Sequence, residues 1–132
     1  MIFITNSDFP NINIVQTDYS EESLAKACKG QDVIVSTISA LATMTQTKII
    51  DAAVANGVKR FIPSDFALNT PDMSEIEHHL PALYQRLKPK KQILDYLSQK
   101  ALQNPDFSWT AIGAAPLFDW VNYSTTLMTT LC

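Results

Sequence analysis

The run DVIVSTIS at residues 32–39 places the strongest constraint on the fold, because it is nearly continuously apolar and has the length of a strand. Runs of this kind are typical of strands in parallel sheets, which are buried on both faces, so that side chains need not alternate between apolar and polar. The run therefore favours a parallel sheet over an antiparallel one.

Three other segments have the pattern of strands. NINIVQTD alternates apolar and polar residues and ends at Asp18, KRFIP is a short apolar run closed by a proline, and FSWTAI is rich in aromatic and β-branched residues. We predict strands near 12–17, 32–37, 59–62 and 108–112.

Helices are predicted between these strands. Ser20, followed by two glutamates, has the pattern of a helix N-cap, and Gly30 is the expected stop of that helix. A second helix is predicted over about 43–56 and a third over about 89–103, with a polar loop from 64 to about 80. The alternation of strands and helices predicts an α/β fold, a doubly wound parallel sheet with right-handed crossovers and helices on both faces.

Charge and composition exclude several classes of function. A net charge of −3 and a pI near 5.2 argue against a nucleic-acid-binding protein, which needs a basic face. No apolar run approaches the roughly eighteen residues of a membrane span, and the start of the chain has no positive region typical of a secretory signal. Cys28 and Cys132 lie far apart, so we expect no metal site and a reduced, cytoplasmic protein. Cys28 is interpreted as a core thiol on the face of the first helix.

The glycines give the most informative negative result. Dinucleotide-binding chains usually carry a cluster of glycines after their first strand, where the backbone approaches the phosphates. Here Gly30, Gly57 and Gly113 stand alone. This sequence therefore contains no recognisable pyrophosphate loop.

Four stretches carry a resemblance to a known family: FPNINIVQTDYSEESLAKACKGQDVIVSTIS, IIDAAVANGVKRFIPSDFALNT, LKPKKQILDYLSQKA and APLFDW. Together they resemble the isoflavone reductase-like, or NmrA-like, proteins, which are atypical short-chain dehydrogenases, here of a fungal type. The resemblance implies a Rossmann-like fold that is incomplete in this chain. We expect residues 1–132 to form a partial NAD(P)-binding domain that lacks the family's glycine-rich loop and its carboxyl-terminal substrate region.

The resemblance also implies a cofactor, NADPH in preference to NADH, and positions that would line its site. Asp18 matches an acid near the adenine end, and residues 36–38 match a loop whose backbone lines the cofactor. Pro63, Ser64 and Phe66 match the loop beside the nicotinamide, which explains why a strand leaves through Pro-Ser-Asp into an apolar residue. The cofactor-binding residues implied in this way are Asp18, Ser36, Thr37, Ile38, Pro63, Ser64 and Phe66.

A catalytic lysine is implied at the start of the last helix, with Lys88, Lys90 and Lys91 as candidates. Helical spacing places Lys90 on the apolar face of this helix and Lys91 on a polar face, at pairing distance from Asp95. Lys88 precedes Pro89 and is expected outside the helix. Lys90 is therefore the predicted catalytic residue, which would position the nicotinamide ribose or move a proton. The alternative is a lysine that buries only its stem and keeps its amine in water.

Two other patterns are weaker. Tyr84 and Lys88 have the Tyr-x-x-x-Lys spacing of the main short-chain dehydrogenases, but Pro89 is expected to interrupt any helix that would align them. His78 and His79 are adjacent and are interpreted as a solvated pair in a loop.

Three functions stay open. The first is an NAD(P)H-dependent reductase of small aromatic or phenolic molecules. The second is a dinucleotide-sensing regulator without turnover, and the third is a remnant that binds no ligand. Because the glycine loop is absent, we expect no measurable binding of NADPH at micromolar concentrations by this chain alone.

Overall fold

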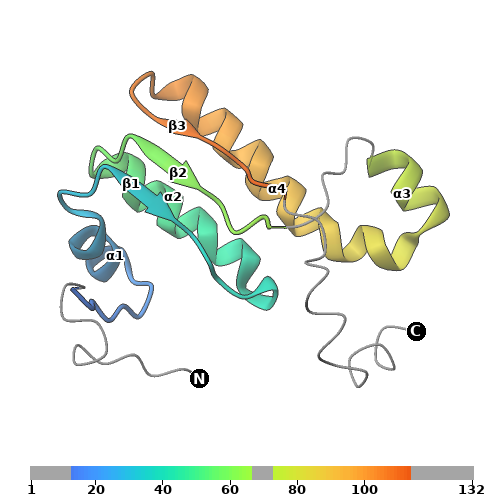
Figure 1. The fold of residues 1–132 in the computed structure, drawn as a ribbon, viewed down its shortest axis with the longest axis horizontal. Helices are drawn as coiled ribbons and strands as arrows, with labels where there is room; N and C mark the ends of the chain where they lie inside the picture. Colours follow the sequence, from blue (N-terminus) through green and yellow to red (C-terminus); the bar gives the residue numbers. More distant parts are fainter. Residues whose placement is uncertain (1–12, 67–72, 114–132) are drawn as a thin grey trace.

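A computed structural model of the protein describes residues 13–66 and 73–113. Three strands, β1 (Val33–Val35), β2 (Arg60–Ile62) and β3 (Ser108–Trp109), form a parallel sheet in the order β1-β2-β3. Ile34 is paired with Phe61, and Phe61 with Trp109. The helices are α1 (Glu21–Cys28), α2 (Gln46–Ala55), α3 (Met73–His79) and α4 (Pro81–Gln103), and a 3-10 turn, η1 (Ala40–Thr45), leads into α2. The predicted parallel α/β fold is confirmed (Figure 1).

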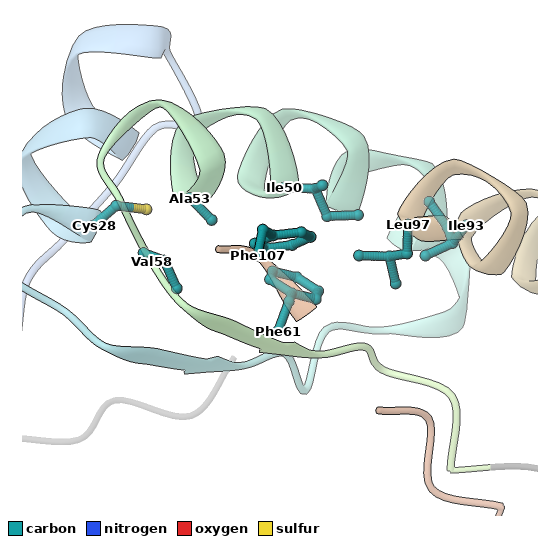
Figure 2. Packing of buried hydrophobic residues seen from close by; sticks show 8 residues of the cluster. All are labelled: Cys28, Ile50, Ala53, Val58, Phe61, Ile93, Leu97 and Phe107. Atoms are coloured by element: carbon teal, nitrogen blue, oxygen red, sulfur yellow. The ribbon is translucent and has the colours of Figure 1, made fainter. Parts of the chain in front are cut away.

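Helices α2 and α4 cover the same face of the sheet, and the core lies between them and the strands (Figure 2). The expected helix layer on one face of the sheet is thus formed by these two elements. The strand order explains this, because successive right-handed crossovers that advance in one direction place their helices on one side. On the other face, Val33 and Val35 of β1 are 50% and 55% exposed.

The core is an apolar cluster centred on Phe61, which is fully buried on β2. Burial of a side chain of this size stabilises the fold by about 1.5–3 kcal/mol. The cluster draws on three helices and two strand regions and consists of Cys28, Ile50, Ala53, Val58, Phe61, Ile93, Leu97 and Phe107. Trp109, in the stretch FSWTAI that is interpreted as a strand, is partly buried against it.

The end of α2 follows the predicted Asn-Gly stop. Gly57 has φ +74°, which a residue with a side chain adopts only with strain. The N–H of Gly57 donates to the Val54 carbonyl at 3.2 Å, and the N–H of Val58 donates to the Ala53 carbonyl at 3.0 Å. These two bonds form a Schellman motif, which turns the chain directly into β2.

The predicted first strand does not form over its described residues. Residues 13–17 belong to no strand, and Ile14 and Val15 are 41% and 47% exposed. A strand needs a hydrogen-bonded neighbour, and the described sheet, β1-β2-β3, does not pair with this segment. No described residue takes the place of that neighbour.

The last helix starts earlier than predicted. Helix α4 begins at Pro81, a position where the missing N–H of proline costs nothing, and runs through Pro89. Lys88 is therefore inside the helix, so its predicted place outside is wrong. The predicted polar loop from 64 to about 80 likewise contains the helix α3. Strand β3 is shorter than the predicted 108–112.

From their sequence, Phe118, Asp119 and Trp120 of the APLFDW stretch are interpreted as a packing corner, and they lie outside the described residues. Within the described part of the chain, no helix combines the length and the apolar character that crossing a membrane requires.

Candidate functional site

The loops that leave β1 and β2 lie side by side at the carboxyl end of the sheet, where parallel α/β folds bind ligands. The backbone N–H of Ser36 donates to the Ile62 carbonyl at 2.8 Å, which continues the parallel pairing one step past β1. Beyond this point the Ser64 hydroxyl donates to the Ile38 carbonyl at 2.9 Å. Two of the three segments predicted to line a cofactor are thus brought together.

The Ser36 side chain is buried beneath this edge, with a relative exposure of 5%. Within residues 13–66 and 73–113, its hydroxyl is the buried side-chain polar group that has no hydrogen-bond partner. A buried hydroxyl without a partner costs about 1–3 kcal/mol, which a polar group from outside the protein can offset. This unpaired hydroxyl fits a site that receives a polar ligand.

Lys90 joins the same edge from helix α4. Its ammonium nitrogen lies 3.5 Å from a carboxylate oxygen of Asp65, and the two side chains are only 20% and 17% exposed. Lys91 instead pairs with Asp95 one turn along the helix, where the two side chains are 48% and 62% exposed. The predicted difference between an inward-leaning Lys90 and an outward-facing Lys91 is confirmed.

Helix packing explains why Lys90 leans inward. Ile93 and Leu97, three and seven residues further along α4, are 1% and 0% exposed in the core. Lys90 continues this buried stripe towards the end of the sheet, where it reaches the exit of β2. Asp65 therefore belongs to the site, although its residue type alone gave no sign of this role.

Asp18 occupies a turn of its own ahead of α1. One of its carboxylate oxygens accepts hydrogen bonds from the Ser20 N–H at 2.9 Å and from the Ser23 hydroxyl at 2.7 Å. Hydrogen bonding to Ser20 and Ser23 holds the pKa of the Asp18 carboxyl well below its usual range. Ser20 caps α1 as predicted, since its side chain accepts from the Ser23 N–H. The hydrogen bonds of Asp18 to Ser20 and Ser23 do not connect it to the loops that leave β1 and β2.

The remaining predicted site residues differ in exposure. Pro63 is buried, Ile38 is half-buried, Thr37 is exposed, and Phe66 is 42% exposed at the end of the described loop. Thr37 and Phe66 therefore present their side chains to the surface.

A second Tyr-x-x-x-Lys spacing, which the sequence analysis did not single out, joins Tyr96 and Lys100 on α4. The Tyr96 hydroxyl donates to Asp51 of α2 at 2.6 Å, and the Lys100 ammonium also lies 2.6 Å from Asp51. Burial and the hydrogen bond to Asp51 raise the pKa of Tyr96. Through Asp51, this cluster ties α4 to α2.

Tyr84 and Lys88 do share a face of α4, since the Lys88 ammonium lies 5.7 Å from the centre of the Tyr84 ring. The expectation that Pro89 would separate them is wrong, because the helix starts a full turn and more before the proline. Leu87, which lies between them in the sequence, is the first buried residue of this helix.

His78 and His79 are exposed as expected, but they lie in α3, where His79 is 3.3 Å from Glu75. Among the described residues, no group of three or more histidines, cysteines and carboxylates is arranged to hold a metal. A groove of about 390 Å³ lies between α1 and α2 and is lined in part by Lys48 and Asp51. It lies on the helix layer, away from the strand ends.

Comparison with known families and proteins places this edge in context. A family model described as NAD(P)H-binding matches residues 4–130. The chain therefore belongs to the NAD(P)H-binding family, as its resemblance to NAD(P)-binding reductases indicated.

Its relatives include fungal and plant oxidoreductases. Oxidoreductase aprR of Aspergillus flavus is 36% identical over 118 residues, which cover 87% of this chain and 38% of that protein. Isoflavone reductase homolog P3 of Arabidopsis thaliana is 36% identical over 84 residues, covering 62% of this chain and 27% of that protein. The predicted isoflavone reductase-like character is confirmed, and the chain spans less than two fifths of either relative.

A solved structure, AtPrR2 with NADP+ and (+)pinoresinol, matches with a TM-score of 0.59 and 28% identity. The match covers 74% of this chain and 31% of that one. It confirms a Rossmann-like arrangement that is partial here, and together with the family match it supports NAD(P)H as the cofactor.

Proposed function

We propose that this chain supplies the nicotinamide end of the active site of an NAD(P)H-dependent reductase, which acts on small aromatic or phenolic molecules. The bound cofactor would supply the hydride. The described residues would position the cofactor and the substrate and handle the proton.

The pairing of Lys90 with Asp65 at the exit of β2 is the observation that carries this proposal. A lysine 20% exposed and 3.5 Å from a carboxylate 17% exposed is held in one place, whereas a snorkelling surface lysine moves freely. Asp65 keeps the ammonium at the carboxyl end of the sheet, where a ligand lies in this fold. From there Lys90 would donate a hydrogen bond to the ribose or a proton to the substrate oxygen.

The exit loops support the same proposal. Ser36 contributes a buried hydroxyl without a partner, and the bond between Ser64 and Ile38 fixes the two loops relative to each other. NADPH is the favoured cofactor, in line with the NADP+ bound to the solved relative AtPrR2. The substrate class follows from that relative and from the plant isoflavone reductase homologues.

The test is a fluorescence titration with NADPH and NADH of two proteins: the 132-residue chain, and a chimera that adds both the amino-terminal and the carboxyl-terminal parts of oxidoreductase aprR. This sequence has no glycine cluster, and several charge-assisted hydrogen bonds to the pyrophosphate, each worth about 1.5–3 kcal/mol, are therefore supplied only by the chimera. We expect micromolar binding of NADPH by the chimera and none by the chain alone.

Turnover would then be measured with the chimera and a panel of phenolic substrates. Oxidation of NADPH that depends on the phenol supports the reductase. Binding without turnover on any panel member would favour the dinucleotide-sensing alternative, and absence of binding by the chimera would overturn the proposed cofactor site.

A further inference from the structure

Gln46, the first residue of α2, is a buried polar residue without an assigned role. It is 1% exposed and continues the buried stripe of α2 with Ile50 and Ala53, four and seven residues further on. An uncharged amide at such a position is costly unless it is hydrogen-bonded. Its burial therefore calls for specific partners.

Both ends of the Gln46 amide have partners. The side-chain oxygen accepts a hydrogen bond from the backbone N–H of Ser64 at 2.8 Å. The side-chain nitrogen donates to the Thr43 carbonyl in η1 at 3.3 Å. The orientation of the amide is fixed by these bonds, because a backbone N–H can only donate and a carbonyl can only accept.

Ser64 is consequently held from two sides. Its backbone N–H is bound by Gln46, and its hydroxyl donates to the Ile38 carbonyl at 2.9 Å. The next residue, Asp65, turns back on the loop through its own N–H, which donates to the Pro63 carbonyl at 2.8 Å, and its carboxylate faces Lys90. The position of the Lys90 ammonium therefore depends, through Asp65, on the position of the Ser64 backbone.

We infer that Gln46 is a positioning residue, which clamps the exit loop of β2 to the start of α2 and thereby holds Asp65 and Lys90 at the proposed nicotinamide position. This inference rests on the proposed function for the role of Lys90, but the clamp itself is a property of the 132-residue chain. Its test therefore needs no cofactor.

The first measurement is amide hydrogen exchange of Ser64, with the core amide of Phe61 as an internal reference for folding. In Gln46→Leu the Ser64 N–H loses its acceptor, and protection of this amide should fall by about tenfold or more relative to Phe61. Gln92→Leu on the exposed face of α4 is the matched control and should leave Ser64 unchanged.

The variant Gln46→Glu separates the two hydrogen bonds of the amide. A glutamate oxygen can accept from the Ser64 N–H whether the carboxyl is neutral or ionised, whereas only the neutral acid can also donate to Thr43. At pH 5, protection of Ser64 relative to Phe61 should therefore be much closer to wild type in Gln46→Glu than in Gln46→Leu. Equal loss of protection in the two variants would show that Gln46 acts only by filling space.

The second measurement is the rate at which an amine-acylating reagent modifies Lys90 and Lys91. Gln46→Leu should raise the rate at Lys90 by about threefold or more, because Asp65 is no longer held beside it, and should leave Lys91 unchanged. Unaltered protection of Ser64, or an unaltered rate at Lys90 despite lost protection, would overturn the inference. Neither result bears on whether the chimera binds NADPH, so failure of the proposed function would be seen separately.

Discussion

The Lys90 ammonium lies 3.5 Å from the Asp65 carboxylate, so the long helix α4 is tied to the loop that leaves β2. Lys90 and Asp65 are 25 positions apart in the sequence and meet because α4 packs along the sheet. This contact distinguishes Lys90 from its neighbour Lys91, which pairs with Asp95 on the exposed face of α4.

The first prediction compares these two lysines in the chimera that binds cofactor. Lys90→Ala should lower kcat by about 100-fold, the effect expected when a positioned acid is removed, and change the Kd for NADPH much less. Lys91→Ala removes an exposed ion pair worth at most about 1 kcal/mol and should change neither quantity appreciably. Steady-state kinetics and a fluorescence titration measure the two effects. Equal losses of kcat in both variants would contradict the assignment of Lys90.

The second prediction concerns the core of the sheet. Phe61 is fully buried between β2 and the helices, so Phe61→Ala should lower the free energy of unfolding by about 3–5 kcal/mol and can leave the chain unfolded. Leu102→Ala, at a side chain that is 87% exposed, should cost less than about 0.5 kcal/mol. Urea unfolding followed by circular dichroism measures both. A similar small loss in both variants would show that the core does not pack around Phe61.

The third prediction concerns the contact of Tyr96 and Lys100 with Asp51. Burial and the bond to Asp51 raise the pKa of Tyr96, and the hydrogen bond to Asp51 raises the pKa of Lys100. A raised folded pKa means that the stabilisation is fully present below the unfolded values, about 10 for both groups, and is lost as the pH rises through the folded values. The urea concentration at the midpoint of unfolding should therefore decrease as the pH rises above about 10.

The matched variants for this prediction are Tyr96→Phe and Tyr84→Phe. Tyr96→Phe removes the donor to Asp51, so its urea midpoint should decrease less above pH 10 than that of the wild type. Tyr84→Phe should show the same dependence of the urea midpoint on pH as the wild type. The same dependence of the urea midpoint on pH in the wild type and in Tyr96→Phe would contradict a contribution of Tyr96.

Much of the fold follows from local patterns in the sequence. The apolar runs around Ile34 and Phe61 and the Asn-Gly stop at Gly57 are local signals, and the structure confirms all three. The inward position of Lys90 was also predictable, because helical spacing relates it to Ile93 and Leu97 regardless of where the helix begins.

Other features depend on partners distant in the sequence. The segment 13–17 has a strand pattern but no described neighbour to pair with, and the start of α4 depends on Pro81 as well as Pro89. Gln46 and Asp65 have polar side chains whose roles come from contacts 18 and 25 residues away, which no local pattern reveals. The one available signal was that Gln46 shares a helical face with Ile50 and Ala53.

The last prediction concerns the thiol of Cys28. Cys28 is 3% exposed at the end of α1 and packs in the core cluster, and burial raises the pKa of its thiol. Since the thiolate is the reactive form, alkylation by iodoacetamide at pH 8 should be slow in the folded protein and should rise about 100-fold or more in urea. The alkylation rate in the folded protein then reports on opening of the α1–α2 contact.

The measurement uses a Cys132→Ser background, so that Cys28 is the thiol observed. Phe61→Ala should speed the alkylation of Cys28, because it loosens the cluster that covers the sulfur. Rapid alkylation of the folded protein at the rate seen in urea would show that α1 does not pack against the core.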